Sequence, residues 1–237
     1  KEMIRSIEET FNSFGFSPID TPALEYTEIL LGKGSGETDK QLYRFEDQGG
    51  RDVALRFDLT IPLARFSAMH IHEVGTPFKR YHIAPVWRAE KPQRGRYREF
   101  FQCDIDIIGS NSRLADAEVI ATISSALDAL KINHRFRINN RKILSSLLEE
   151  VGAADKTTEV LRAIDKLEKQ GEKKVVEELQ AELKDDQIES LLSFLKISGS
   201  NAEILETLKS RLKDDSGILE LEKTLEYLNS YGIAENS

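Results

Sequence analysis

The chain has 237 residues, of which 40% are hydrophobic and 31% are charged, and its formal net charge at pH 7 is −8. This composition is typical of a globular protein with one large domain or two modest ones. The single cysteine, Cys103, excludes an intramolecular disulfide framework and a cysteine zinc cluster, and it is compatible with a reducing cytosol. The acidic balance argues against nonspecific coating of nucleic acid, and the apolar runs are too short to span a bilayer.

The first part of the chain predicts short strands and turns, because all six prolines lie within the first 92 residues. Residues 1–14 repeat apolar positions at helical spacing and end at Gly15, which predicts a helix. We then expect an extended segment at 16–26, a flexible glycine-rich loop at 32–40, strands at 43–46 and 53–57, and a helix from Ile61 or Pro62.

The middle of the chain predicts two longer strands, at 78–88 and 98–109, that pair antiparallel through a basic loop. A helix at 114–130, a short strand at 135–139 and a helix at 141–151 are expected to follow. From residue 153 onward, apolar residues recur at helical spacing in successive stripes, which predicts a small helical bundle. The segment 111–237 has 18 basic and 24 acidic residues, which most simply lie on the solvated faces of these helices.

The loop between the two longer strands concentrates positive charge. Its five basic residues within eleven positions, opposed only by Glu90, are Arg88, Lys91, Arg94, Arg96 and Arg98. A guanidinium group presents a planar fork of donors that can grip phosphate at two points, so this segment indicates a phosphate site. Pro92 and Gly95 permit the long turn that such a hairpin needs. The alternative is a solvent-exposed loop that balances an acidic protein.

The second strand of this hairpin alternates between two chemically different faces. The residues expected on its packed face are Phe101, Cys103, Ile105 and Ile107, and those expected on its polar face are Arg98, Gln102, Asp104 and Asp106. Gln102 and Asp106 are separated by roughly 13 Å at the rise of a strand, so they could bracket a small polar ligand. The alternative is an ordinary sheet whose outer face meets water.

The segment 55–65, LRFDLTIPLAR, offers a third polar element. If it stays extended, Asp58 and Thr60 point the same way as Arg56. A carboxylate beside a hydroxyl in that arrangement suits an ammonium group. Thr60, which precedes Ile61 and Pro62, is also a good helix N-cap, and both interpretations stay open.

Other motifs give weaker signals. The four histidines lack the spacing of metal ligands, so we expect no transition-metal site built by the protein. The GKGSG run at 32–36 lacks the spacing of a P-loop, and no GxSxG nucleophile motif occurs. The sequence therefore favours catalysis by binding and orientation over covalent catalysis by a side chain.

The stretch FKRYHIAPVWRAEKPQRGRYREFFQCDIDIIG resembles motif 2 of class II aminoacyl-tRNA synthetases, and specifically that of histidyl-tRNA synthetases. LRFDLTIPLARF is similar to the histidine-binding segment of that family, and FSPIDTPALEY resembles motif 1, with Pro22 as its proline. RINNRKIL and VLRAIDKLEKQGEKKV resemble the segments that lead into the family's helical insertion domain. The resemblance covers most of residues 1–180, and the later helices match in character only.

The resemblance implies an α+β fold. An incomplete class II antiparallel sheet flanked by helices would occupy residues 1–152, and an all-helical insertion domain would occupy 153–237. By position, Arg88 would be catalytic and would contact both the α-phosphate of ATP and the histidine carboxylate. Glu90 would lie against the adenine amino group, and Arg96 would reach the terminal phosphates. Asp58, Thr60 and Gln102 would hold the α-amino group or backbone atoms of histidine, and Asp106 would face the imidazole.

The activity that the resemblance implies is ATP-dependent histidine–tRNA ligation in the cytoplasm. L-Histidine, ATP and Mg²⁺ would give histidyl-adenylate, and the histidyl group would pass to tRNA(His). The basic loop and the insertion domain would approach the acceptor stem, and motif 1 implies a homodimer of the full-length protein. Motif 3, a histidine-specific motif and an anticodon-binding domain are absent from this sequence, so we interpret the chain as an N-terminal fragment that is inactive alone.

The main alternative is a regulatory subunit of ATP phosphoribosyltransferase, which is synthetase-like and binds histidine without aminoacylation. The presence of Arg88, Glu90 and Arg96 argues against it, because a protein that does not use ATP needs no phosphate grip. A purely structural α/β module is a third interpretation, and it would leave the polar strand face and the basic loop unexplained.

Overall fold

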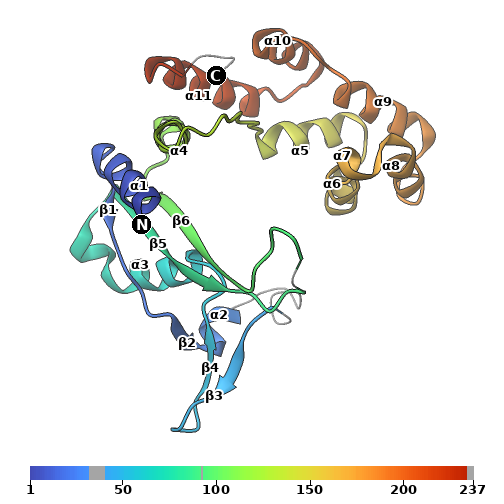
Figure 1. Cartoon of the computed structure of the whole chain (residues 1–237). Coiled ribbons are helices and arrows are strands. Elements are labelled where there is room, and N and C mark those ends of the chain that lie inside the picture. The colour runs from blue at the N-terminus through green and yellow to red at the C-terminus, as the bar shows by residue number, and fades with distance from the viewer. Residues whose placement is uncertain (32–40, 92, 234–237) are drawn as a thin grey trace. The chain divides into compact units, whose positions relative to one another are not determined.

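A computed structural model describes residues 1–31, 41–91 and 93–233 of the chain (Figure 1). The chain divides into two compact units, Lys1–His134 and Arg135–Ser237. The expected glycine-rich loop at 32–40 and the proline expected in the basic turn, Pro92, lie outside the described residues. Within the described residues, no helix combines the length and the apolar character needed to cross a membrane.

The N-terminal unit is mixed α and β, as the sequence predicts. Its elements in chain order are α1 (Glu2–Ser13), β1 (Ser17–Pro18), β2 (Leu24–Tyr26), α2 (Thr27–Leu31), β3 (Arg44–Glu46), β4 (Asp52–Leu55), α3 (Thr60–Val74), β5 (Phe78–Trp87), β6 (Glu99–Ile108) and α4 (Arg113–Ala129). One sheet has the order β1-β5-β6, and a second, small antiparallel sheet has the order β2-β4-β3. Strand β1 runs parallel to β5, and β6 runs antiparallel to it.

The long β5–β6 hairpin is the frame of this unit, and helices pack on both of its faces (Figure 1). On one face, the rings of Phe11 from α1 and Tyr81 from β5 lie 5.5 Å apart, in a core that also includes Ala126 from α4. On the other face, Phe66 from α3 stacks on Phe78 from β5 with ring centroids 6.0 Å apart. The alternation of β5 supplies both contacts, because neighbouring residues of a strand point to opposite faces.

The packed face expected along β6 is only half correct. Ile105 and Ile107 pack against the core beneath α1 and α4, but Phe101 is 58% exposed and Cys103 is exposed. The prediction of a core position is therefore wrong for Phe101 and Cys103. Strand alternation fixes which side chains share a face, but burial also needs a covering element, and α1 and α4 cover only one end of the hairpin.

The C-terminal unit is entirely helical in its regular structure. Its elements are α5 (Arg141–Glu150), the 3₁₀ turn η2 (Ala154–Lys156), α6 (Thr157–Ile164), α7 (Leu167–Gln170), α8 (Glu172–Leu179), α9 (Asp185–Leu195), α10 (Asn201–Arg211) and α11 (Ser216–Ser230). The predicted apolar stripes share one core, which includes Val160, Val175, Leu191, Leu205 and Ile218.

One expectation about the segment that follows His134 changes. Residues 135–139 are irregular backbone, so the short strand expected there is wrong. A strand needs a neighbour to pair with, and none of the described strands pairs with this segment. The compact units divide at His134–Arg135, because α5 buries Leu147 and Leu148 in the helical core, and the expected boundary between catalytic core and insertion domain at residue 152 stays a prediction.

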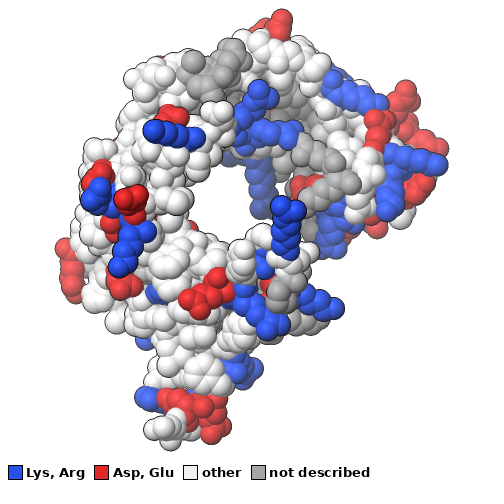
Figure 2. All heavy atoms as spheres, viewed as in Figure 1, with Lys and Arg blue, Asp and Glu red and all other residues white. Residues whose placement is uncertain are grey.

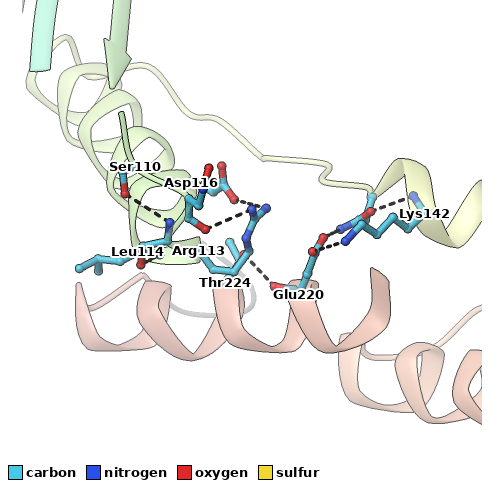
Figure 3. A network of polar contacts seen from close by, with 10 residues as sticks. Ser110, Arg113, Leu114, Asp116, Lys142, Glu220 and Thr224 are labelled. Atoms are coloured by element: carbon cyan, nitrogen blue, oxygen red, sulfur yellow. Dashed lines mark hydrogen bonds and ion pairs between the residues drawn. The ribbon is translucent and has the colours of Figure 1, made fainter. Parts of the chain in front are cut away.

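Helices α5 and α11 approach each other closely at their N-terminal ends. Asn140 and Lys142 both donate to the Glu220 carboxylate, over 2.7 and 2.6 Å (Figure 3). Gly217 permits this approach, because a Cβ at that position would lie 2.8 Å from the backbone nitrogen of Ile143 and 2.9 Å from the Cβ of Lys142. The absence of a side chain at Gly217 therefore sets how closely the two helices pack.

We expect Gly217→Ala to destabilise the helical unit, although alanine is the better helix former. The added methyl group meets backbone, and overpacking of this kind costs about 1–3 kcal/mol. Thermal unfolding followed by circular dichroism should show a lower Tm. The control is Asn229→Ala, which lies exposed on the same helix and should leave Tm unchanged or slightly raised. An equal rise in both variants would contradict the packing account.

Candidate functional site

The polar face of the β5–β6 hairpin brings three pairs of residues opposite one another. The antiparallel register pairs Arg80 with Asp106, His82 with Asp104, and Ala84 with Gln102. All six positions are even-numbered and therefore share one face of the hairpin. The structure thus places the predicted residues Gln102 and Asp106 on the same face, together with Arg80, His82 and Asp104.

Arg88 lies where this face meets the basic loop. Its backbone N–H donates to the carbonyl oxygen of Arg98 over 2.9 Å, which closes the hairpin. Its guanidinium Nε donates to the carbonyl oxygen of Phe57 over 3.1 Å, and the group lies 5.0 Å from the ring centroid of Phe100. Arg88 is half-buried, so the remaining donors of its guanidinium fork can face a ligand.

The segment after β4 does not stay extended, so one predicted arrangement is wrong. Helix α3 begins at Thr60, and the Asp58 carboxylate accepts from the backbone N–H groups of Thr60 and Ile61, both over 3.1 Å. Asp58 is therefore the capping side chain, in place of the Thr60 cap that the sequence suggested. Thr60 is exposed and Arg56 is buried, so they do not point the same way.

Arg56 is a buried structural clamp. Its side chain is 4% exposed, and it donates to the carbonyl oxygens of Pro85, over 3.1 Å, and of Thr21, over 2.5 Å. These bonds tie the loop before β2 to the end of β5. The backbone of Arg56 also donates to Ala23 and accepts from Trp87. The clamp therefore fixes the segment that carries Asp58 beside the strand that carries Arg88.

The basic loop is held by contacts of its own. The Glu90 carboxylate lies 3.4 Å from the Arg96 guanidinium, whose side chain is 63% exposed. Gln93 and Arg96 bridge across the turn, where Gly95 adopts a φ of +80° that favours glycine. Figure 2 shows Lys and Arg side chains around the loop that joins β5 and β6, whereas both signs of charge mix over the helical unit.

Arg80 and His82 are buried ionisable groups behind the polar face. Arg80 is wholly buried and forms an ion pair with Asp106, whose side chain is 34% exposed. The His82 Nε2 lies 3.1 Å from the Asp20 carboxylate. Burial, followed by the nearby charge of Arg56, lowers the pKa of His82, so this imidazole is held neutral.

Burial also raises the pKa of two carboxyl groups on this face. Desolvation is the main cause for both Asp104 and Asp106, and the Arg80 charge opposes it in each case. The neighbouring charges of Asp106 and Asp58 raise the pKa of Asp104 further. A face that holds several acids against buried cations is the electrostatic pattern of a functional site.

Several buried polar atoms on this face lack a hydrogen-bond partner. In the described part of the chain they include Gln102 Oε1, His82 Nδ1 and the Nε and Nη1 of Arg80. Native structures satisfy most buried polar atoms, so unsatisfied ones on one face need an explanation. Acceptors on Gln102 and Asp106 that point at the same side of a sheet suit a ligand that carries N–H donors.

Comparison with known proteins decides the family. The model of the histidyl-tRNA synthetase family matches residues 1–234. The chain belongs to the histidyl-tRNA synthetase family. A histidine–tRNA ligase of Rhodopirellula baltica is 56% identical over 211 residues, which are 88% of this chain and 48% of the relative. One of Clostridium tetani is 44% identical over 244 residues, which are 100% of this chain and 55% of the relative.

Solved structures give the same fold. The histidyl-tRNA synthetase of Nostoc sp. PCC 7120 superposes with a TM-score of 0.87 and 34% identity, over 99% of this chain and 55% of that protein. A Bacillus halodurans protein described as an ATP phosphoribosyltransferase regulatory subunit/histidyl-tRNA synthetase gives a TM-score of 0.82 and 27% identity, over 98% of this chain and 61% of its own. The chain thus spans about half the length of the curated relatives that it matches.

Sequence reasoning missed two residues that shape this candidate site, Arg80 and His82, and it placed Arg56 only as pointing the same way as Asp58 and Thr60. Arg80 belongs to no recognised pattern, and His82 is an isolated histidine. The sequence did carry one signal for these residues. Arg80 and His82 alternate with apolar Tyr81 and Ile83, so on a strand they must share a face. The depth of their burial could not be read from the sequence.

We expect Arg56→Met to lower the free energy of unfolding by roughly 2–4 kcal/mol, because buried carbonyl oxygens lose their donors. Chemical denaturation at neutral pH measures this change. The matched control is Arg44→Met, which removes an exposed ion pair with Asp52 and should cost less than about 1 kcal/mol. Equal losses in the two variants would show that Arg56 is not a clamp.

We expect Asp104→Asn to raise Tm at about pH 7, by roughly a few degrees. Because the pKa of Asp104 is raised in the folded chain, folding at neutral pH carries the cost of a buried, ionised carboxylate. The folded chain takes up this proton before the unfolded chain does, so stability rises as pH falls through the raised pKa. The advantage of Asn should therefore shrink in acid, toward the ordinary value of 3.8.

Thermal unfolding at several pH values checks the Asp104 prediction. Glu9→Gln is the control, because its carboxylate is 71% exposed on α1 of the same unit and should give little change at any pH. A gain from Asp104→Asn that stays constant down to acid pH would contradict the role of ionisation.

Proposed function

We propose that this chain is the N-terminal part of a histidine–tRNA ligase, with a partial catalytic core at 1–152 and an insertion domain at 153–237. The observation that carries this proposal is the position of Arg88. Its bonds to Phe57 and Arg98 hold it where the basic loop, the Asp58 segment and the polar face of β6 meet. In a chain of this family, that convergence suits a substrate with a phosphate at one end and an amino acid at the other.

ATP would lie along the basic loop. Arg88 would contact the α-phosphate, because it is half-buried and fixed by two hydrogen bonds. Arg96 would reach the terminal phosphates from its exposed position, and Glu90 would lie against the adenine amino group. The Glu90–Arg96 pair of the free chain would then open, since both groups would take substrate partners.

Histidine would lie on the polar face of β6. Gln102 Oε1, which has no partner among the described residues, and the Asp106 carboxylate would receive N–H donors of the α-amino group and of the imidazole. Asp58 and Thr60 would approach the α-amino group from the start of α3, and Arg88 would hold the carboxylate. This places the carboxylate next to the α-phosphate, as direct attack requires.

The proposed reaction has two steps. A carboxylate oxygen of histidine attacks the α-phosphorus of ATP, the bond to pyrophosphate breaks, and histidyl-adenylate forms. A hydroxyl of the tRNA 3′ end then attacks the acyl carbon, and AMP leaves. Arg88 stabilises the negative charge that develops on the α-phosphate, a preorganised electrostatic contribution that needs no covalent catalyst.

Mg²⁺ would enter with ATP. Within the described residues, no three His, Cys, Asp or Glu side chains gather into a metal cluster. The groups along the loop are mainly cationic and suit phosphate oxygens, while Mg²⁺ is commonly bound through substrate phosphates and one or two carboxylates. When bound, the ion neutralises phosphate charge during the first step.

The nucleic-acid partner would be the acceptor stem of tRNA(His). We propose that the loop between Glu90 and Arg96 approaches it, together with the helical unit. The family also supports a homodimer through motif 1 in the full-length protein, and a location in the cytoplasm.

The test is histidine-dependent ATP–pyrophosphate exchange by the full-length protein that carries this chain. We expect exchange with L-histidine, and we expect Arg88→Ala to lower kcat by on the order of 10²–10³. The matched control is Arg94→Ala, in the same exposed loop but without an assigned contact, which should change kcat by less than about threefold. The 237-residue chain alone should give no exchange.

Absence of histidine-dependent exchange in the full-length protein would overturn the proposal. It would favour the second candidate, a regulatory subunit of ATP phosphoribosyltransferase, which the Bacillus halodurans likeness supports. The two candidates also differ in nucleotide binding at the basic loop. Calorimetric titration with ATP separates them, because only the ligase needs Arg88 and Arg96 to hold phosphates.

A further inference from the structure

The two buried arginines of the N-terminal unit have different partners. Arg56 donates to the backbone carbonyl oxygens of Pro85 and Thr21, as a structural arginine does. Arg80 is wholly buried, yet its Nε and Nη1 have no hydrogen-bond partner in the described part of the chain. Its Nη2 forms an ion pair with the Asp106 carboxylate. An arginine buried at such a cost needs a role that the fold alone does not supply.

Arg80 and Asp106 differ in how far each side chain is accessible from the polar face. Arg80 lies on the inner strand β5, between β1 and β6, and none of its side chain is exposed. Asp106 lies opposite on β6, and 34% of its side chain is exposed. A ligand on the polar face would therefore touch Asp106, while Arg80 would act on the ligand only through that carboxylate.

We propose that Arg80 is a positioning residue for recognition of the histidine ring, holding Asp106 ionised and fixed as an acceptor for a ring N–H. This inference rests on the proposed function. An ionised carboxylate can only accept hydrogen bonds, whereas a protonated one also donates. A fixed acceptor therefore selects a ring edge that carries an N–H. Gln102 Oε1, an unpartnered buried acceptor on this face, is the neighbouring contact of the same substrate.

Charge around Asp106 makes this role necessary. Burial raises the pKa of Asp106, and the Arg80 charge opposes that rise. Asp104 is the adjacent acid on the same face, and its own surroundings include Asp58 and Arg88. Without Arg80, Asp106 would remain buried but would no longer have a positive charge beside it. Its pKa would therefore rise further. Protonation would then remove the acceptor at a pH where the natural site still recognises the ring.

The test measures histidine-dependent ATP–pyrophosphate exchange by the full-length protein over a range from about pH 5.5 to about pH 8.5. We expect Arg80→Met to raise KM for histidine by roughly tenfold to a hundredfold, with KM for ATP within about twofold of the natural value. The loss should grow as pH falls, because Asp106 then takes up a proton. Arg80→Lys should restore part of the affinity, since it keeps the charge without the fork.

A double-mutant cycle separates positioning from packing. If Arg80 acts through Asp106, Arg80→Met should cost little in an Asp106→Asn background, so the two losses should not add. Gly217→Ala is the control for a destabilised chain whose polar strand face is unchanged, and it should lower Tm without a pH-dependent change in KM for histidine. NMR titration of labelled aspartate carboxyl groups adds a direct readout, and Arg80→Met should raise the pKa of Asp106.

Three results would overturn the inference while leaving the proposed function standing. They are additive losses in the cycle, an equal rise in KM for histidine and for ATP, and a pH profile of Arg80→Met that matches the natural protein. Absence of histidine-dependent exchange in the natural full-length protein would instead overturn both the proposed function and this inference.

Discussion

The antiparallel register of the β5–β6 hairpin is the constraint on which the rest of the N-terminal unit depends. Because side chains alternate along each strand, the register places Arg80 opposite Asp106 and Ala84 opposite Gln102 on one face. The apolar residues of the other face pack against α1 and α4. A shift of one residue would turn the polar face into the core and would bury the wrong set. The same strand pairing therefore determines both the candidate site and the core.

Buried arginines extend this constraint to neighbouring segments. Arg56 ties the loop before β2 to the end of β5, so the start of α3 lies beside the hairpin. Arg88 makes a similar connection at the loop end of the hairpin, because its Nε donates to the carbonyl oxygen of Phe57. Each bond joins segments far apart in the chain and satisfies a carbonyl group that would otherwise lose its donor. Backbone contacts therefore hold the candidate site from several sides.

The energetics of the polar face favour function over stability. Burial raises the pKa of Asp104 and Asp106, which means that their ionised forms are costly in the folded chain. The buried Gln102 Oε1 also lacks a partner among the described residues. A face built only for stability would replace these groups with apolar side chains. Their presence together fits a surface that becomes satisfied when a ligand with N–H donors binds.

The sequence by itself determined the local elements. Helical spacing located most of the helices between Glu2 and Ser230, although the short helix α2 was not expected. The basic loop between two alternating strands located the hairpin and its polar residues. These features are local, because periodicity and turn residues act over a few positions. The long motif also identified the family that the comparisons show.

Only the tertiary structure decided what covers each face. It exposed Phe101 and Cys103, made Asp58 the cap of α3, and left residues 135–139 outside the regular helices and strands. It also buried Arg56, Arg80 and His82, which no local pattern distinguishes from surface residues. Burial, desolvation and pairing depend on elements distant in the chain. The sequence therefore locates the chemistry of the site, whereas packing between distant segments sets its geometry and its charges.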